Sequence, residues 1–147
     1  MGMLFPGSMG TRTGSTLEVT VEAVLLNNSY AVQKQQLVGT KPGGGRHKVD
    51  LVGMRPNGSK FLVSLKWQQT AGSAEEKIPF EVIKLLHTLR ENTAYDKAYI
   101  VVGGDGFNTG LIGFYLSEEF RSYIRESQKI EILTLNDVIT RANRGAM

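Results

Sequence analysis

The stretch HKVDLVGMRPNGSKFLVSLKWQ, residues 47–68, predicts a β-hairpin, in which two antiparallel strands are joined by a tight turn. Residues 56–59, Pro-Asn-Gly-Ser, form a strong turn signal. The runs before and after this turn are both mostly apolar and are rich in strand-forming residues. We therefore place two neighbouring strands at residues 47–55 and 60–68.

Two charged residues interrupt the apolar strands of this hairpin. Because side chains alternate across a strand, Lys66 shares a face with Leu62, Ser64 and Gln68. Asp50 lies in the preceding strand, where hairpin pairing brings it near Lys66. Charges in an apolar sheet are costly unless they are paired or bind something. A structural ion pair between Asp50 and Lys66 and a ligand-binding site are both open at this point.

The remaining pattern predicts one α/β domain in the order α-β-β-β-α-β, followed by α-β-α. A helix, a three-strand meander, a crossover helix and a buried strand imply a central mixed β-sheet flanked by helices. In the second helix Pro79 is compatible with the first turn, and Ile83, Leu86 and Leu89 predict a broad buried face. We expect helices at 15–27, 77–92, 116–127 and 136–143, strands at 30–39, 47–55, 60–68, 97–104 and 129–133, and a glycine-rich loop at 105–110.

The length of 147 residues suits a single domain. We place this domain at residues 15–147 and expect residues 1–14 to be a flexible tail or an addition to the natural chain. No apolar run approaches the ~18–20 residues that span a membrane. The absence of cysteine excludes disulfides and thiolate zinc sites and agrees with a reducing cytosol. We therefore expect a cytoplasmic protein without a membrane segment.

Basic residues gather in one glycine-rich stretch, TKPGGGRHK, residues 40–48. The whole chain has 17 Lys and Arg against 14 Asp and Glu, a net charge of +3, which favours an anionic partner. A flexible cationic loop suits a phosphate backbone, although a merely solvated hairpin loop is an equal alternative. The stretch does not fit a nucleotide-binding loop, so we expect no small-molecule cofactor. The candidate nucleic-acid-binding residues are Lys41, Arg46, His47 and Lys48.

The order of elements and the positions of Asp50 and Lys66 resemble the PD-(D/E)XK nuclease superfamily, from about Gly14 to Leu133. The resemblance implies a restriction-endonuclease-like core. It also implies that Asp50 holds a divalent metal, Mg²⁺ or Mn²⁺, and that Lys66 positions or activates the water that attacks a phosphodiester. Carboxylate oxygens are the hard ligands that Mg²⁺ prefers, and a lysine can stabilise the charge that develops on the phosphate.

Ser64 departs from the family pattern, because it stands where the second acidic residue of the (D/E)-x-Lys pair belongs. Some restriction enzymes of this superfamily carry Ser-x-Lys and take a glutamate from the following helix. By this resemblance Glu81 is the second metal ligand, with Glu76 as the reserve candidate. Acids in a first helical turn are also favoured by the helix dipole without any function.

Two further residues complete the candidate site. Gln68 could orient a water or a phosphate, or be an ordinary polar residue at a strand end. Glu18 sits where many superfamily members carry a glutamate that touches the site from the first helix. With Glu22 one turn further on, Glu18 could equally face solvent.

The function that this resemblance implies is a metal-dependent DNA endonuclease of the homing, restriction or resolvase type. Cutting both strands needs two active sites, so we expect a homodimer or homotetramer. One alternative is a non-catalytic DNA-binding or assembly domain that kept the fold and lost the chemistry at Ser64. Another is an unrelated α/β domain in which Asp50 and Lys66 are simply paired.

Overall fold

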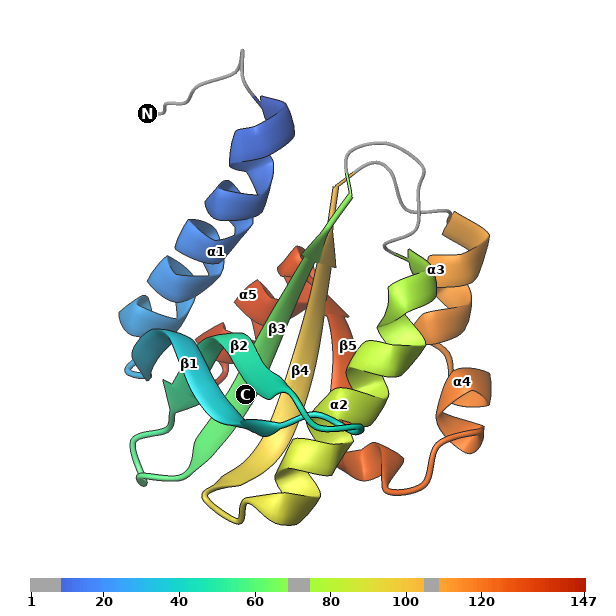
Figure 1. Cartoon of the computed structure of the whole chain (residues 1–147). Coiled ribbons are helices and arrows are strands. Elements are labelled where there is room, and N and C mark those ends of the chain that lie inside the picture. The colour runs from blue at the N-terminus through green and yellow to red at the C-terminus, as the bar shows by residue number, and fades with distance from the viewer. Residues whose placement is uncertain (1–8, 69–74, 105–108) are drawn as a thin grey trace.

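The computed structural model of the protein describes residues 9–68, 75–104 and 109–147, with side chains from Ser15 onward except at Thr109. Its sheet follows the strand order β1-β2-β3-β4-β5 (Figure 1). The β1/β2 and β2/β3 pairs are antiparallel, whereas the β3/β4 and β4/β5 pairs are parallel, so the predicted mixed sheet is confirmed. The strands are β1 (Ala31–Thr40), β2 (Arg46–Met54), β3 (Lys60–Trp67), β4 (Tyr95–Gly103) and β5 (Ile130–Thr134).

Helices cover both faces of the sheet, as the element order predicts. On one face α1 and α5 pack with Leu51, Phe61 and Val101 in one hydrophobic cluster. On the other face α2, α3 and α4 pack with Leu62 and Ile100 in a second cluster (Figure 1). The helical elements are α1 (Met9–Asn27), the 3₁₀ turn η2 (Glu75–Lys77), α2 (Ile78–Glu91), α3 (Thr109–Tyr115), α4 (Glu118–Ser122), η3 (Ser127–Lys129) and α5 (Leu135–Asn143).

Most element bounds agree with the prediction within two residues, but two predicted helices differ by more. The first helix begins at Met9, so residues 9–14, expected as tail, are helical, because extending a helix costs far less than nucleating one. The single helix expected at residues 116–127 is wrong, since α3 ends at Tyr115 and the hydroxyl of Ser117 caps α4 through the amide of Phe120. The loop expected at residues 105–110 is wrong at Thr109 and Gly110, which begin α3, while its residues 105–108 and residues 1–8 of the expected tail lie outside the described residues.

No helix in the described ranges is long and apolar enough to cross a membrane.

Of the buried face predicted for α2, Leu89 is buried and Leu86 is partly buried, whereas Ile83 is not. Ile83 is 53% exposed, whereas Glu81 is only 5% exposed and Thr88 1%. Pro79 lies in the first turn, as predicted. The helix therefore turns two polar residues toward the sheet, which is favourable only if their polar groups find partners there.

Gly53 of β2 is expected to tolerate no side chain. It pairs with Phe61 of β3, and a Cβ at this position would lie inside contact distance of three atoms of the Phe61 ring. Edge contacts with Tyr30 and Tyr99, at centroid distances of 5.7 and 5.5 Å, prevent the ring from moving aside. Gly53→Ala should therefore lower the free energy of unfolding by about 1–3 kcal/mol, measured by urea denaturation.

Gly113 of α3 provides the matched control. A Cβ there meets nothing within 4 Å, and the residue is helical. Gly113→Ala should be neutral or stabilise the protein by about 0.5–1 kcal/mol. Equal stability of Gly53→Ala and the wild type would contradict the packing of Phe61 against this glycine.

Candidate active site

Strands β2 and β3 separate at Asp50. Their ladder runs from Met54–Lys60 to Leu51–Val63. Side-chain alternation in β2 is also interrupted, because Val49 and Val52 both pack on the α2 side. The Asp50 carboxylate turns toward β3, where its Oδ2 accepts a hydrogen bond from the backbone amide of Leu65 at 2.7 Å. This bond fixes the direction of the carboxylate beside the residue that precedes Lys66.

Asp50 and Glu18 line one pocket of about 250 Å³, together with Ser15, Leu17, Leu65 and Trp67. Glu18 is directed by Gln35, whose Nε2 donates to its Oε1 at 3.1 Å. The indole Nε1 of Trp67 is buried and has no hydrogen-bond partner in the described part of the chain. The pocket thus combines two carboxylates from different elements, Glu18 of α1 and Asp50 of β2.

Lys66 extends from β3 toward α2. Its Nζ lies 3.1 Å from Oε1 of Glu81, and Nζ of Lys84 lies 3.0 Å from the same oxygen. The Glu81 side chain is only 6% exposed. Burial alone would raise the pKa of Glu81, but Lys66 and Lys84 together outweigh burial and hold this pKa below its usual value. Glu81 is therefore a buried, ionised partner of Lys66.

These contacts decide one of the alternatives left open above. Within the described residues, the ion pair of Lys66 is with Glu81 and not with Asp50, so a structural Asp50–Lys66 pair is wrong. Glu81 itself is buried against the sheet and does not lie on a solvated helix face. The reserve candidate, Glu76, is exposed in η2.

His47 is buried and is not a loop residue. It lies in β2 with 2% exposure, and its Nδ1 is 2.7 Å from Oγ1 of Thr88 on α2. Its Nε2 has no hydrogen-bond partner within the described residues. Burial lowers the pKa of His47, and the positive charge of Lys84 adds to this effect while Glu81 opposes it. His47 thus belongs to the strand predicted at residues 47–55 and not to the cationic loop at residues 40–48, and its burial leaves it inaccessible to a phosphate at the surface.

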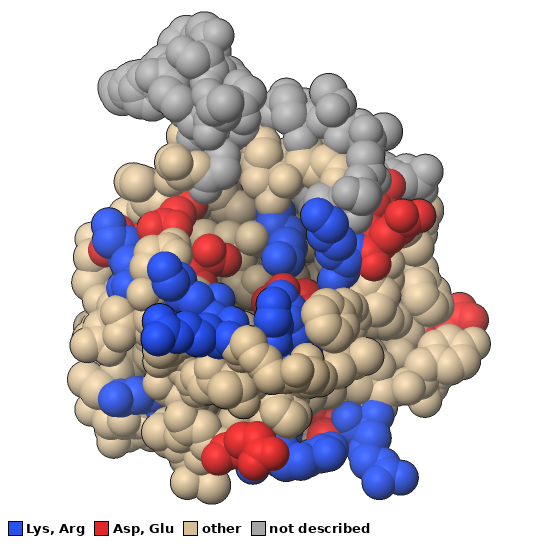
Figure 2. Space-filling model, in the orientation of Figure 1, with Lys and Arg blue, Asp and Glu red and all other residues tan. Residues whose placement is uncertain are grey.

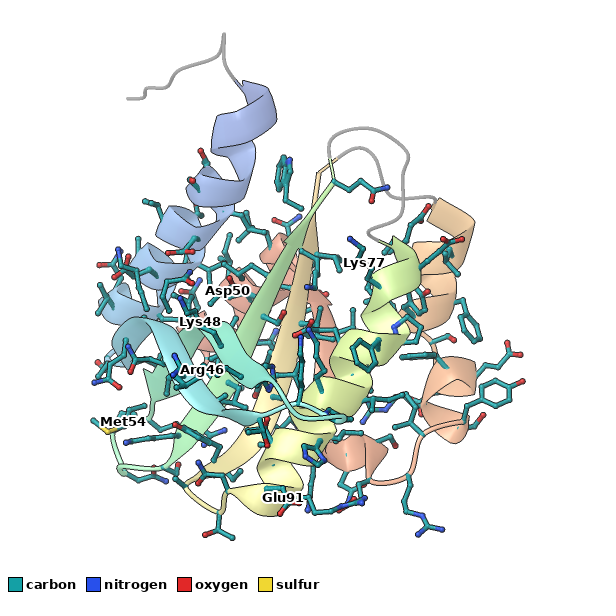
Figure 3. All side chains as sticks on the ribbon, in the orientation of Figure 1. Arg46, Lys48, Asp50, Met54, Lys77 and Glu91 are labelled. Carbon is teal, nitrogen blue, oxygen red and sulfur yellow. The ribbon has the colours of Figure 1, made fainter. Side chains whose placement is uncertain are left out.

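The other predicted residues lie around this centre. Lys41 is in the β1–β2 loop, whereas Arg46 and Lys48 are exposed positions of β2 and not loop residues (Figure 3). Ser64 is buried, with 3% exposure. Gln68 is also buried, and its backbone amide donates to the carbonyl of Gly103 at 3.1 Å, which ties the end of β3 to β4.

Lys84 was not among the predicted site residues. Its position three residues after Glu81, one helical turn away, is the signal that could have identified it as a partner of Glu81.

The topology is that of an α/β domain with a mixed sheet, in which Asp50 and Lys66 lie on adjacent strands. The chain matches the family model described as the PD-(D/E)XK nuclease superfamily domain over residues 9–146, and it belongs to that superfamily. The predicted restriction-endonuclease-like core is thereby confirmed.

Two solved structures are similar to the chain. One is the crystal structure of a protein of unknown function, AF1548, with 10% identity, a TM-score of 0.49, and coverage of 81% of this chain and 56% of that chain. The other is a repair endonuclease from Pyrococcus abyssi, with 11% identity, a TM-score of 0.44, and coverage of 90% and 49%. The chain thus spans about half the length of these structures. No curated protein matches it.

Proposed function

We propose that the protein is a metal-dependent DNA endonuclease. The observation that carries the proposal is the hydrogen bond from the Leu65 amide to the Asp50 carboxylate, which places this carboxylate beside the residue that precedes Lys66. A carboxylate and a lysine on neighbouring strands of one sheet suit phosphodiester hydrolysis. The carboxylate attracts a cation, and the ammonium group stabilises negative charge on the phosphate.

We propose Asp50 and Glu18 as the residues that would hold a divalent metal. They are hard oxygen donors that share one pocket. No group of three His, Cys, Asp or Glu residues suited to a metal occurs in the described ranges. Two carboxylates are nevertheless enough, because Mg²⁺ keeps several waters and commonly binds one or two carboxylates together with substrate phosphate. When bound, the ion would polarise the phosphate and lower the pKa of an attacking water.

The contacts of Glu81 favour Glu18 over Glu81 as the second carboxylate. Two ammonium groups already contact Oε1 of Glu81, and their positive charges oppose the approach of a metal ion. We propose that Glu81 instead holds Lys66 in place. The role of Lys66 is to orient the attacking water or to stabilise charge on the phosphate.

DNA would lie on the face where basic side chains gather. Figure 2 shows Lys and Arg residues spread across this face, around a hollow. Arg46 and Lys48 follow one another along β2 toward Asp50 (Figure 3). We propose that they contact the phosphate backbone together with Lys41 of the adjacent loop. Cleavage of both strands would require two copies of the site, and thus a homodimer or homotetramer.

The experiment is incubation of the purified protein with supercoiled plasmid and with a branched DNA substrate, in Mg²⁺ or Mn²⁺. We expect nicked and linear products that EDTA prevents. The second candidate, a non-catalytic DNA-binding domain, is favoured by Ser64, which offers no carboxylate on β3. If both substrates stay intact in both metals while the protein retains DNA binding, the endonuclease proposal fails and this candidate stands.

A further inference from the structure

Two lysines share one carboxylate oxygen at the edge of the site. Lys66 and Lys84 contact Oε1 of Glu81 at 3.1 and 3.0 Å. Their ammonium nitrogens are therefore at most about 6 Å apart, a distance at which like charges repel. One carboxylate neutralises only one of the two charges. Lys66 and Lys84, which we call the lysine pair, therefore carry a net charge of +1 together with Glu81.

The surroundings of the lysine pair do not neutralise this charge. Within the described residues, Glu81 is the only acidic ion-pair partner of either lysine. The buried neighbours His47 and Thr88 contact each other, and neither side chain carries a negative charge. Neither residue can therefore act as a counter-charge to the two lysines.

The excess charge faces the surface. The side chains of Lys66 and Lys84 are 25% and 22% exposed, so both ammonium groups remain accessible while Glu81 is covered. The direction of Lys84 is also fixed, because its Nζ lies 5.6 Å from the centre of the Phe80 ring. A held, partly exposed cation next to a second cation suits an anionic ligand with more than one charged group.

We propose that Lys84 binds a backbone phosphate of the DNA substrate next to the phosphate contacted by Lys66, and that Glu81 positions both lysines for this. The inference rests on the proposed function, because it takes DNA as the ligand. Glu81 thus holds two cations at a fixed spacing for successive phosphates, and Lys84 is a substrate-binding residue rather than a counter-ion.

The test is the salt dependence of DNA binding, measured in EDTA with a short fluorescein-labelled duplex by fluorescence anisotropy. Each phosphate contact contributes about 0.9 to the slope of log K against log salt. Lys84→Met should reduce the magnitude of the slope by about 0.9, whereas Lys84→Arg, which keeps the charge, should retain the wild-type slope. Circular dichroism verifies that both variants are folded, and Lys84→Gln replaces Lys84→Met if the latter does not fold.

Lys129→Met is the matched control. Lys129 also pairs with a glutamate three residues before it, Glu126, at 3.0 Å, but it lies beside β5 and outside the site. Its removal changes the net charge equally and should leave the slope unchanged. An unchanged slope in Lys84→Met would overturn the inference, since Lys84 would then only neutralise Glu81.

The outcomes separate this inference from the proposed function. If the wild type binds the duplex but never cuts DNA, the endonuclease proposal fails while the slopes still decide the role of Lys84. If the wild type cuts DNA and Lys84→Met keeps the full slope, only the inference on Lys84 fails. If the wild type binds no DNA, both are wrong.

Discussion

Replacement of Lys66 by methionine is expected to reduce DNA cleavage by at least about 100-fold, the usual cost of removing a group that transfers a proton or stabilises charge in the transition state. The fold should survive, because Lys84 continues to pair with the buried Glu81 at 3.0 Å. DNA binding should persist, weakened by the loss of one cation. The measurement is single-turnover cleavage of supercoiled plasmid at saturating protein.

Lys60→Met is the matched control for this substitution. Lys60 lies on the same strand as Lys66 and, by the alternation of side chains, on the same face, but at the opposite end of β3. Its removal should leave the cleavage rate within about twofold of the wild type, since it contacts no part of the site. Lys66 is not a catalytic residue if Lys66→Met and Lys60→Met cleave at similar rates.

Asp50→Asn should also reduce cleavage by at least about 100-fold, because it removes the charge that would hold the metal. Asparagine has the same shape, and its carbonyl oxygen can still accept the hydrogen bond from Leu65, so the junction of β2 and β3 should be preserved. The measurement is the cleavage rate as a function of Mg²⁺ concentration. Direct Mn²⁺ binding, followed by electron paramagnetic resonance, provides a readout that is independent of activity.

Two companion variants identify the second carboxylate. Glu18→Gln should weaken Mn²⁺ binding, because Glu18 shares the pocket of Asp50. Glu81→Gln should leave Mn²⁺ binding unchanged, because Glu81 is occupied by Lys66 and Lys84. The exposed Asp96, which pairs with Arg55, is the control, and Asp96→Asn should change neither cleavage nor metal binding. The opposite result for Glu18 and Glu81 would restore Glu81 as the metal ligand.

Most of the fold follows from local patterns. The turn at residues 56–59 and the apolar runs around it specify the β2–β3 hairpin. The apolar run at residues 97–104 is β4, whose Ile100 and Val101 are buried on opposite faces of the sheet. The third helix was less predictable, because the hydroxyl of Ser117 begins a new helix inside a stretch whose composition reads as one helix.

Placement of the site was predicted only in part. The positions of Asp50 and Lys66 on adjacent strands follow from strand pairing and alternation. The ion-pair partner of Lys66 does not follow from these patterns, because a carboxylate on either β2 or α2 could pair with its ammonium group. Glu81 is the partner because α2 directs Glu81 and Thr88 toward the sheet and leaves Ile83 53% exposed.

Local sequence patterns are enough to predict the order of the elements, the hairpin and the residue types that chemistry on a phosphate requires. This is because turns, periodicity and alternation depend on neighbours in the chain. The tertiary structure alone decided that Asp50 shares a pocket with Glu18, that Glu81 holds two lysines, and that His47 is buried against Thr88. These contacts depend on the rotation of α2 and the separation of β2 from β3, which are set by packing between distant parts of the chain.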